Sequence, residues 1–166
     1  MKALVISESM WGNTHQVADA IAAGLAERMQ VDTRRVDDAP PAIAEDVDLV
    51  VAGGPTHGFS MSRESTRSDA AHRGAEHPSS QGLRDWLEHL PADGGKARIA
   101  TFDTHVEQKW VPGSAAKAAA GEAKHHHLSV IARESFYVHG YEGPLLDGEI
   151  DRARAWGRHL ADLMTG

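Results

Sequence analysis

The sequence predicts an α/β fold in which a parallel β-sheet is covered by helices. Short apolar runs alternate along the chain with longer segments of helical period, which is the pattern of strands joined by crossover helices. Several of the runs are apolar at successive positions, as is typical of strands buried on both faces. The chain has 166 residues and neither an internal repeat nor a linker, so we expect residues 1–166 to form one domain.

The first unit is a strand, a polar loop and a helix. Ala3–Ser7 is a continuous apolar run and is expected to be a central strand. A helix is expected over Asn13–Met29, because apolar residues recur there every four positions, at Val17, Ile21, Leu25 and Met29.

Four further strands complete the expected five-stranded sheet, at Val31–Val36, Val47–Ala52, Lys96–Phe102 and Leu128–Val138. The first of these alternates between polar and apolar residues and suits a sheet edge. The second is the most apolar, and Gly53-Gly54-Pro55 is expected to end it. The last is expected to bend near Arg133-Glu134.

Two of the remaining segments are helix-like. Ser114–Lys124 is rich in alanine, and Ile150–Met164 carries an apolar stripe. Trp86 and Trp156 lie at helical spacing from leucines, which predicts aromatic residues of the core. By contrast, Gly58–Gln81 is long and polar, as functional or mobile loops often are, with a short helix conceivable over Thr66–Arg73.

The composition excludes several classes of function. There is no cysteine, which removes disulfides, thiolate nucleophiles and iron–sulfur clusters. With 17 Lys and Arg against 24 Asp and Glu, the net charge is −7, which argues against nucleic acid as a partner. No apolar run approaches the roughly 20 residues of a membrane span, and the apolar start is too short for a signal peptide. We therefore expect a cytoplasmic protein.

Polar residues follow three of the expected strands, where open α/β sheets bind ligands. The loop from Ser7 to Thr14 offers hydroxyls, an amide, a glycine and the free N–H groups of a helix start, all of which suit a phosphate. It has no Lys and matches neither the G-x-x-x-x-G-K-[ST] nor the G-x-G-x-x-G motif, so nucleoside triphosphates and NAD fit it poorly. The alternative for this loop is that Asn13 or Thr14 only caps the helix.

The other two loops are Gly53–Gly58 and the segment from Asp103 to Ser114. In the first, Gly54 and Gly58 permit close approach of the backbone to a ligand. The second supplies a polar rim that contains Trp110.

These motifs resemble those of the flavodoxin family. The run S-M-W-G-N-T at residues 9–14 matches the loop that binds the FMN phosphate, G-G-P-T-H-G at 53–58 is similar to the loop against the isoalloxazine ring, and residues 136–140 resemble the last strand. The resemblance covers nearly the whole chain. It implies a three-layer α/β/α sandwich with strand order 2-1-3-4-5 and non-covalently bound FMN.

The resemblance also implies which residues bind FMN. The phosphate would be bound by Ser9, Trp11, Asn13 and Thr14, in a loop that also contains Met10 and Gly12. The flavin ring would be lined by Thr56, His57 and Gly58, which follow Pro55, and its pyrimidine edge approached by Asp103, Thr104 and His105. His57 stands where flavodoxins often carry Trp, so the aromatic cover of the ring is incomplete unless Trp110 or Phe59 supplies it.

The resemblance implies electron transfer through the flavin, with redox partner proteins that present basic docking surfaces to this acidic chain. The absence of Lys and Arg from the first two loops would lower the second reduction potential, and protonation of His57 near pH 6.5 would make the potential depend on pH. No catalytic side chain is expected. No metal site is expected either, because the consecutive His125, His126 and His127 cannot converge on one ion; a solvated helix end is expected there.

Two alternatives stay open. An FMN-dependent NAD(P)H quinone or nitro reductase would use the 58–81 segment as a lid and Arg63, Arg67 and Arg73 as an anion clamp. A chain that keeps the fold without FMN would act as an interaction module.

Overall fold

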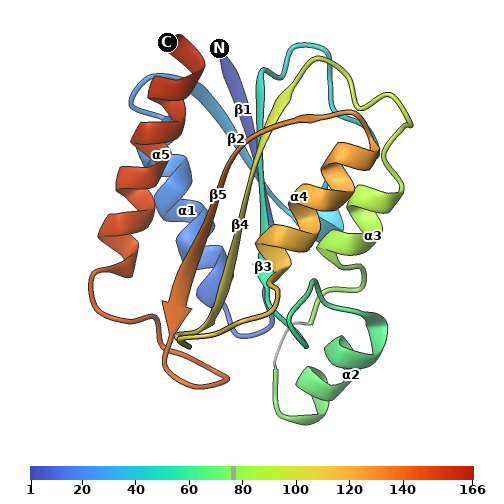
Figure 1. Cartoon of the computed structure of the whole chain (residues 1–166), viewed down its shortest axis with the longest axis vertical. Helices are drawn as coiled ribbons and strands as arrows, with labels where there is room; N and C mark the ends of the chain where they lie inside the picture. Colours follow the sequence, from blue (N-terminus) through green and yellow to red (C-terminus); the bar gives the residue numbers. More distant parts are fainter. Residues whose placement is uncertain (76–77) are drawn as a thin grey trace.

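The computed structural model describes residues 1–75 and 78–166, and its centre is a five-stranded parallel sheet with the order β2-β1-β3-β4-β5. The strands are β1 (Lys2–Ser7), β2 (Gln30–Arg35), β3 (Leu49–Pro55), β4 (Arg98–Val106) and β5 (Ser129–Val138). Helices lie on both faces of the sheet (Figure 1). The predicted three-layer α/β/α fold and its strand order are confirmed.

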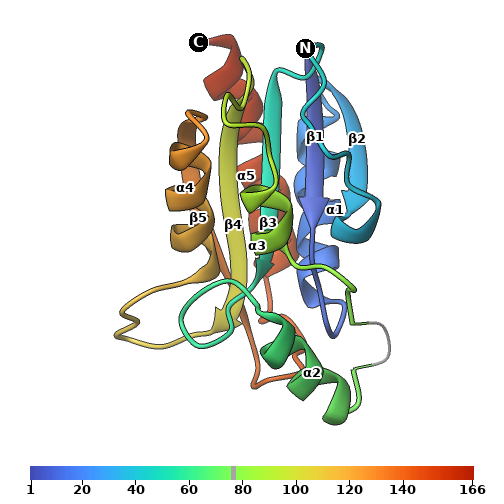
Figure 2. The same cartoon turned by 90° about the vertical axis from the view of Figure 1, so that its right-hand side faces the viewer.

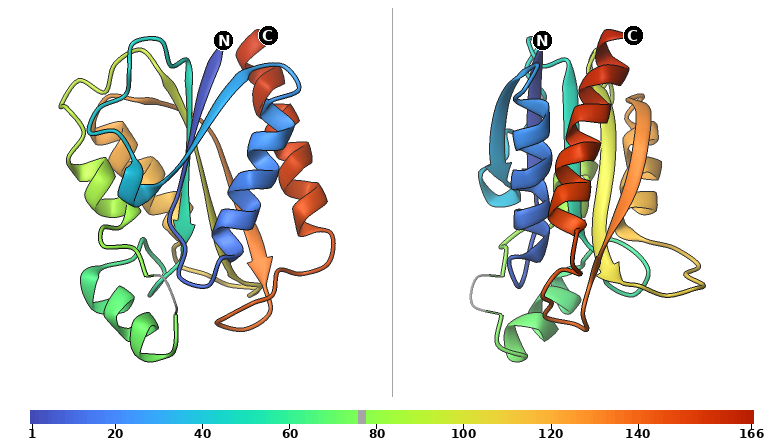
Figure 3. Two further views of the ribbon diagram at one scale, coloured as in Figure 1. Left: turned by 180° about the vertical axis from the view of Figure 1, so that it is seen from behind. Right: turned by 90° about the vertical axis from the view of Figure 1, so that its left-hand side faces the viewer.

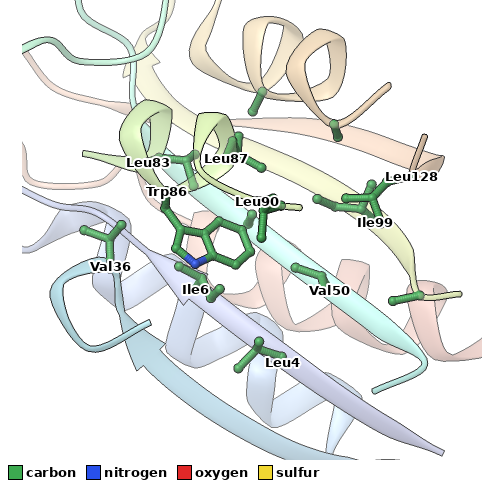
Figure 4. Packing of buried hydrophobic residues seen from close by; sticks show 14 of the residues in the cluster. Leu4, Ile6, Val36, Val50, Leu83, Trp86, Leu87, Leu90, Ile99 and Leu128 are labelled. Atoms are coloured by element: carbon green, nitrogen blue, oxygen red, sulfur yellow. The ribbon is translucent and has the colours of Figure 1, made fainter. Parts of the chain in front are cut away.

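One face of the sheet is covered by α3 (Leu83–Glu88) and α4 (Ala115–His125). Trp86 of α3 packs against Ile6 and its neighbours in this layer of the core (Figure 4). Its indole N–H donates to the carbonyl oxygen of Pro40 at 2.7 Å, so the ring is both buried and hydrogen-bonded. The prediction that Trp86 is a core residue is confirmed.

The other face is covered by α1 (Asn13–Leu25) and α5 (Glu149–Thr165), which run side by side (Figure 3). Trp156 of α5 meets Phe102 and Phe136 edge-to-face, with centroid distances of 6.4 and 6.0 Å, and is a core residue as predicted. The two helices touch at glycines: a Cβ on Gly24 would lie 2.1 Å from the carbonyl oxygen of Arg154. Glycine at this position allows the close approach.

The structure differs from the expected elements in three respects that matter for the fold and the site. The first helix ends at Leu25 rather than Met29, because the chain turns before it enters β2 at Gln30. The irregularity of β5 expected near Arg133-Glu134 is found two residues before Arg133: the register passes from Ile99↔Val130 to Ala100↔Ala132, so the extra residue is Ile131.

The third difference positions the site. β3 does not end before Gly53, and β4 does not end at Phe102, because the two strands continue to pair through Gly54↔Asp103 and Pro55↔Thr104. Asp103, Thr104 and His105 therefore lie on the last rungs of β4 and not in the loop after it. Backbone pairing fixes them, and their side chains alternate between the two faces of the sheet.

Beyond the carboxyl ends of the strands lies α2 (Glu64–His72), which begins two residues before and ends one residue before the expected Thr66–Arg73 helix (Figure 2). It belongs to the polar 58–81 segment, of which residues 76–77 lie outside the described residues. In the part of the chain that the structure describes, no helix is long and apolar enough to span a membrane.

Buried polar groups hold this segment to the sheet. Glu8, directly after β1, accepts a hydrogen bond from the Leu83 N–H at 2.8 Å and one from the Ser62 hydroxyl. The guanidinium of Arg67 donates to Ser62 and pairs with Asp85 at 3.2 Å. Burial raises the pKa of Glu8, against the hydrogen bonds that favour its carboxylate.

Candidate functional site

A pocket opens where β1, β3, β4 and β5 end, and it brings together most of the residues predicted to bind the cofactor. The predicted residues that line it are Ser9, Met10, Trp11, Asn13, Thr14, Pro55, Thr56, His57, Thr104 and His105. Gly12, Gly58 and Asp103 do not line it. In the part of the chain that the structure describes, the lining includes no Lys or Arg.

Four lining residues were missed from the sequence: Val106, Val138, Gly140 and Tyr141. Val106 ends β4, and the other three belong to β5 and the loop after it. The signal that could have found them is the rule that ligands bind beyond the strand ends, applied to the fifth strand as well as the first, third and fourth.

The loop before α1 presents an uncapped helix N-terminus. The N-cap is Gly12, in the left-handed conformation with φ of 89°, and no side chain in the described residues caps the helix. Asn13 instead donates its side-chain amide to the Glu142 carbonyl oxygen at 2.8 Å. The Thr14 hydroxyl lies 2.7 Å from that of Thr104. The alternative that Asn13 or Thr14 caps the helix is therefore wrong, and the first-turn N–H groups lack a capping side chain.

Ser9 and Met10 shape this loop from within. The Ser9 hydroxyl accepts a hydrogen bond from the Gly12 N–H at 2.9 Å, which closes the turn. Met10 is buried and packs with Ala70 of α2, and Trp11 packs against the same cluster. The polar 58–81 segment thus contacts the loop at residues 9–14.

The loop after β3 is built around a tight turn. His57 and Ser60 exchange backbone hydrogen bonds, and Gly58 and Phe59 between them have positive φ values of 56° and 61°. Nδ1 of His57 lies 3.0 Å from the Thr66 hydroxyl of α2. Burial, and secondly the charge of Arg67, lower the pKa of His57 below its ordinary 6.5.

Neither of the two aromatic residues considered as ring cover lines the pocket. The side chain of Phe59 is half exposed at the turn, and Trp110 is 91% exposed in the loop after β4. Tyr141 lies at the pocket wall instead, with the guanidinium of Arg73 4.6 Å from its ring centroid.

The three residues at the end of β4 have different surroundings. The Thr104 hydroxyl is hydrogen-bonded to that of Thr14. The His105 ring lines the pocket and packs edge-to-face on Tyr137 at 5.3 Å. Asp103 is fully buried, and its Oδ2 accepts from the Ala116 N–H at 2.9 Å. Asp103 therefore contacts the start of α4 and does not line the pocket.

Of the three arginines considered as an anion clamp, Arg67 is held elsewhere. Its side chain is 8% exposed and engaged with Ser62 and Asp85. Arg63 is the N-cap residue of α2, and Arg73 reaches the pocket wall at Tyr141. The three arginines therefore do not form an anion clamp together, because Arg67 is paired with Asp85.

The histidine run at residues 125–127 ends α4, but it is not solvated throughout. The side chain of His126 is largely buried, with Nδ1 3.0 Å from the Pro91 carbonyl oxygen and Nε2 3.3 Å from Glu122. Its expected exposure is therefore wrong. Within residues 1–75 and 78–166, no group of three or more His, Asp or Glu side chains is arranged to hold a metal ion.

His15, in the first turn of α1, is a second partly buried histidine. Nδ1 of His15 is 2.8 Å from the Ser7 hydroxyl, which also accepts from Arg35. Burial, with the Arg35 charge beside it, lowers the pKa of His15 to about 4. The folded protein thus favours the neutral ring.

This shift predicts a dependence of stability on pH. An unfolded His15 takes up a proton below its ordinary pKa of 6.5, whereas the folded one does so only near 4, so the free energy of unfolding falls as the pH falls between these values. Substitution His15→Gln is expected to flatten that fall in urea denaturation curves. His159→Gln, at an exposed position on α5, is the control and should keep the wild-type slope. Parallel slopes for wild type and His15→Gln would contradict the assignment.

Comparison with known proteins agrees with this fold. Residues 5–85 match the family model described as flavodoxin. The predicted resemblance to the flavodoxin family is confirmed over residues 5–85, and the whole chain has a flavodoxin-like fold. No curated protein matches its sequence.

Several solved structures share the fold. A flavodoxin from the domain Archaea is 17% identical, with 100% of both chains covered and a TM-score of 0.65. A WrbA-like flavodoxin from Agrobacterium tumefaciens is 17% identical over 99% of this chain and 97% of that one, with a TM-score of 0.55. A flavone reductase is 18% identical over 99% of this chain and 63% of that one, with a TM-score of 0.62.

Proposed function

We propose that this protein binds FMN non-covalently in the pocket and transfers electrons through the bound flavin. The observation that carries the proposal is the uncapped start of α1, which faces a pocket lined by the hydroxyls of Ser9, Thr14 and Thr104. Free helix N–H groups and neutral hydroxyls fit a phosphate, and they fit it without an ion pair, as the absence of Lys and Arg from the described lining requires.

The residues present fit FMN along the rest of the pocket as well. Ser9, Trp11, Asn13 and Thr14 would hold the phosphate. Thr56 and His57, with the neighbouring peptide of Gly58, would lie along the ring, and Thr104 and His105 would face its pyrimidine edge. When bound, FMN supplies the redox chemistry, and the chain supplies binding, orientation and electrostatics.

The proposal is tested by the absorption spectrum of the purified protein. Visible flavin bands that copurify, or that change on addition of FMN to the apoprotein, are the expected result. A spectrum without flavin, together with no change on adding FMN, would contradict the proposal and favour an interaction module that has the fold without the cofactor.

A second candidate is an FMN-dependent NAD(P)H quinone or nitro reductase. The absence of Phe59 and Trp110 from the pocket lining favours it, since room above a flavin is what a hydride donor and an acceptor need. The fold is also shared with a flavone reductase. A carrier is expected to oxidise NADPH only slowly without a reductase. Rapid consumption of NADPH with a quinone would instead establish the reductase.

For a carrier, the net charge of −7 favours redox partner proteins with basic docking surfaces. The expected location is the cytoplasm, which cell fractionation would test.

His57 provides a prediction on the pH dependence of this chemistry. Its ring lies in the pocket and its pKa is lowered, so a proton binds to it only below pH 6.5 and then adds a positive charge beside the ligand. Substitution His57→Phe is expected to flatten the rise of the flavin midpoint potential as the pH falls below 6.5. An unchanged slope in a redox titration would refute the role of His57, whatever the absolute potential.

A further inference from the structure

One buried carboxylate oxygen beside the pocket has no hydrogen-bond donor. Oδ1 of Asp103 lacks a partner among the described residues, although the side chain is fully buried and Oδ2 is bound by the Ala116 N–H. A buried carboxylate oxygen without a donor is costly, so a native structure that keeps one needs a reason for it.

The group that faces this oxygen is the imidazole of His105. The two residues are separated by one position on β4 and so lie on the same face of the sheet. Nε2 of His105 is 3.6 Å from Oδ1 of Asp103. The ring is 11% exposed, and Tyr137 packs against it at 5.3 Å. The carboxylate therefore lies behind a ring that lines the pocket.

The hydrogen bonds of the ring decide which nitrogen carries a proton. Nδ1 of His105 lies 2.8 Å from the carbonyl oxygen of Val106, and because a carbonyl only accepts, Nδ1 must donate. A neutral ring would then turn the lone pair of Nε2 toward the carboxylate oxygen, and with no proton between them neither atom satisfies the other. A second proton, on Nε2, would make the ring a cation that faces Oδ1 at 3.6 Å as an ion pair.

We propose that Asp103 is a positioning residue that holds His105 with a proton on each ring nitrogen, so that the ring lining the pocket is the positive member of an ion pair. Tyr137 on β5 packs on the ring, and His57 and Tyr141 are titratable side chains that line the same pocket. Arg152 lies beyond Tyr137, 5.7 Å from its centroid. Asp103 is the carboxylate that contacts His105.

The consequence rests on the proposed function. A flavin gains negative charge on full reduction, and a positive charge at the β4 wall favours that charge. This effect opposes the net charge of −7, which by itself would lower the potential of the second electron. The pair thus suits the pocket to donate two electrons, as the reductase candidate requires, rather than one electron at low potential.

The protonation of His105 is tested without FMN, by ¹⁵N NMR of the histidine rings of the apoprotein. In the wild type, both nitrogens of His105 are expected to resonate as protonated. In Asp103→Asn, the new amide donates to Nε2, so that nitrogen is expected to resonate as a lone-pair nitrogen. Glu107→Gln, which removes an exposed carboxylate just after β4, is the matched control and should resemble the wild type. A lone-pair nitrogen on His105 in the wild type, or no change in Asp103→Asn, would overturn the proposal.

The effect on the pocket is tested with FMN. The preference for reduced over oxidised FMN is expected to fall about tenfold in Asp103→Asn and in His105→Gln, which lowers the two-electron midpoint potential by about 30 mV. Glu107→Gln should leave it unchanged. Binding of FMN with equal potentials in all four proteins would overturn the inference and leave the proposed function standing. Failure of the wild type to bind FMN would overturn the proposed function, while the NMR result would still decide the state of His105.

Discussion

Substitution Ser9→Asp is expected to weaken FMN binding by at least about a hundredfold while riboflavin, which lacks the phosphate, binds as before. The Ser9 side chain is buried in the loop before α1, and its hydroxyl lies 2.9 Å from the Gly12 N–H. A carboxylate here would face the phosphate. Two unit charges 4 Å apart repel by about 4 kcal/mol at an effective dielectric constant of about 20, which exceeds the predicted loss.

The matched control for Ser9→Asp is Ser9→Asn, which has nearly the same shape without the charge. It is expected to retain most of the affinity for FMN. The measurement is a fluorescence titration of each protein with FMN and with riboflavin. Equal losses for both flavins in both variants would show a damaged loop, and full retention of FMN by Ser9→Asp would place the phosphate elsewhere.

Substitution Gly24→Ala is expected to lower the free energy of unfolding by about 3 kcal/mol. A Cβ at this position would lie 2.1 Å from the carbonyl oxygen and 3.1 Å from the carbonyl carbon of Arg154. These are backbone atoms, which cannot rotate away as a flexible side chain can. The helices α1 and α5 must therefore separate, and apolar contacts of the core on that face of the sheet are lost with them.

Gly121→Ala provides the control within the same chain. Gly121 lies in the exposed face of α4, and nothing lies within 4 Å of a Cβ placed there. Because alanine favours the helix, this variant should be more stable by up to about 1 kcal/mol. Urea denaturation measures both. A stability of Gly24→Ala equal to that of the wild type would mean that the two helices are not packed as closely as described.

The elements with strong local patterns were predictable from the sequence. Ala3–Ser7 is apolar at nearly every position because β1 is buried on both faces, and the predicted strand agrees with β1. The loop S-M-W-G-N-T has the hydroxyls and the glycine that place an uncapped helix at the pocket. In both cases residues close in the chain determine the result, so reading the sequence was enough.

What depends on distant residues was not predictable. Asp103 looks like a loop residue because it is polar, but its pairing with Gly54 of β3 extends the strand and buries it. Tyr141 enters the pocket because the loop after β5 folds back toward α1, where Asn13 contacts Glu142. Arg67 looks like a free cation in a polar segment, yet its guanidinium pairs with Asp85 and donates a hydrogen bond to Ser62. These contacts join residues that are far apart in the chain, so no local sequence pattern predicts them.

The pocket combines features that act in opposite directions on a bound flavin. The negative net charge and the absence of Lys and Arg from the described lining disfavour negative charge on the ligand. The pair of Asp103 and His105 favours it from one wall, and His57 adds to it only when the pH is low. Under the proposed function, the balance among these groups decides between a one-electron carrier and a two-electron reductase.

The central claim is that the uncapped start of α1 binds the phosphate of FMN, and one titration tests it most directly. Wild-type apoprotein is titrated with FMN and with riboflavin while flavin fluorescence is followed. We expect a Kd for FMN of about a micromolar or below, equivalent to about −8 kcal/mol, and markedly weaker binding of riboflavin. Binding of FMN weaker than about a millimolar, or equal affinity for the two flavins, would contradict it.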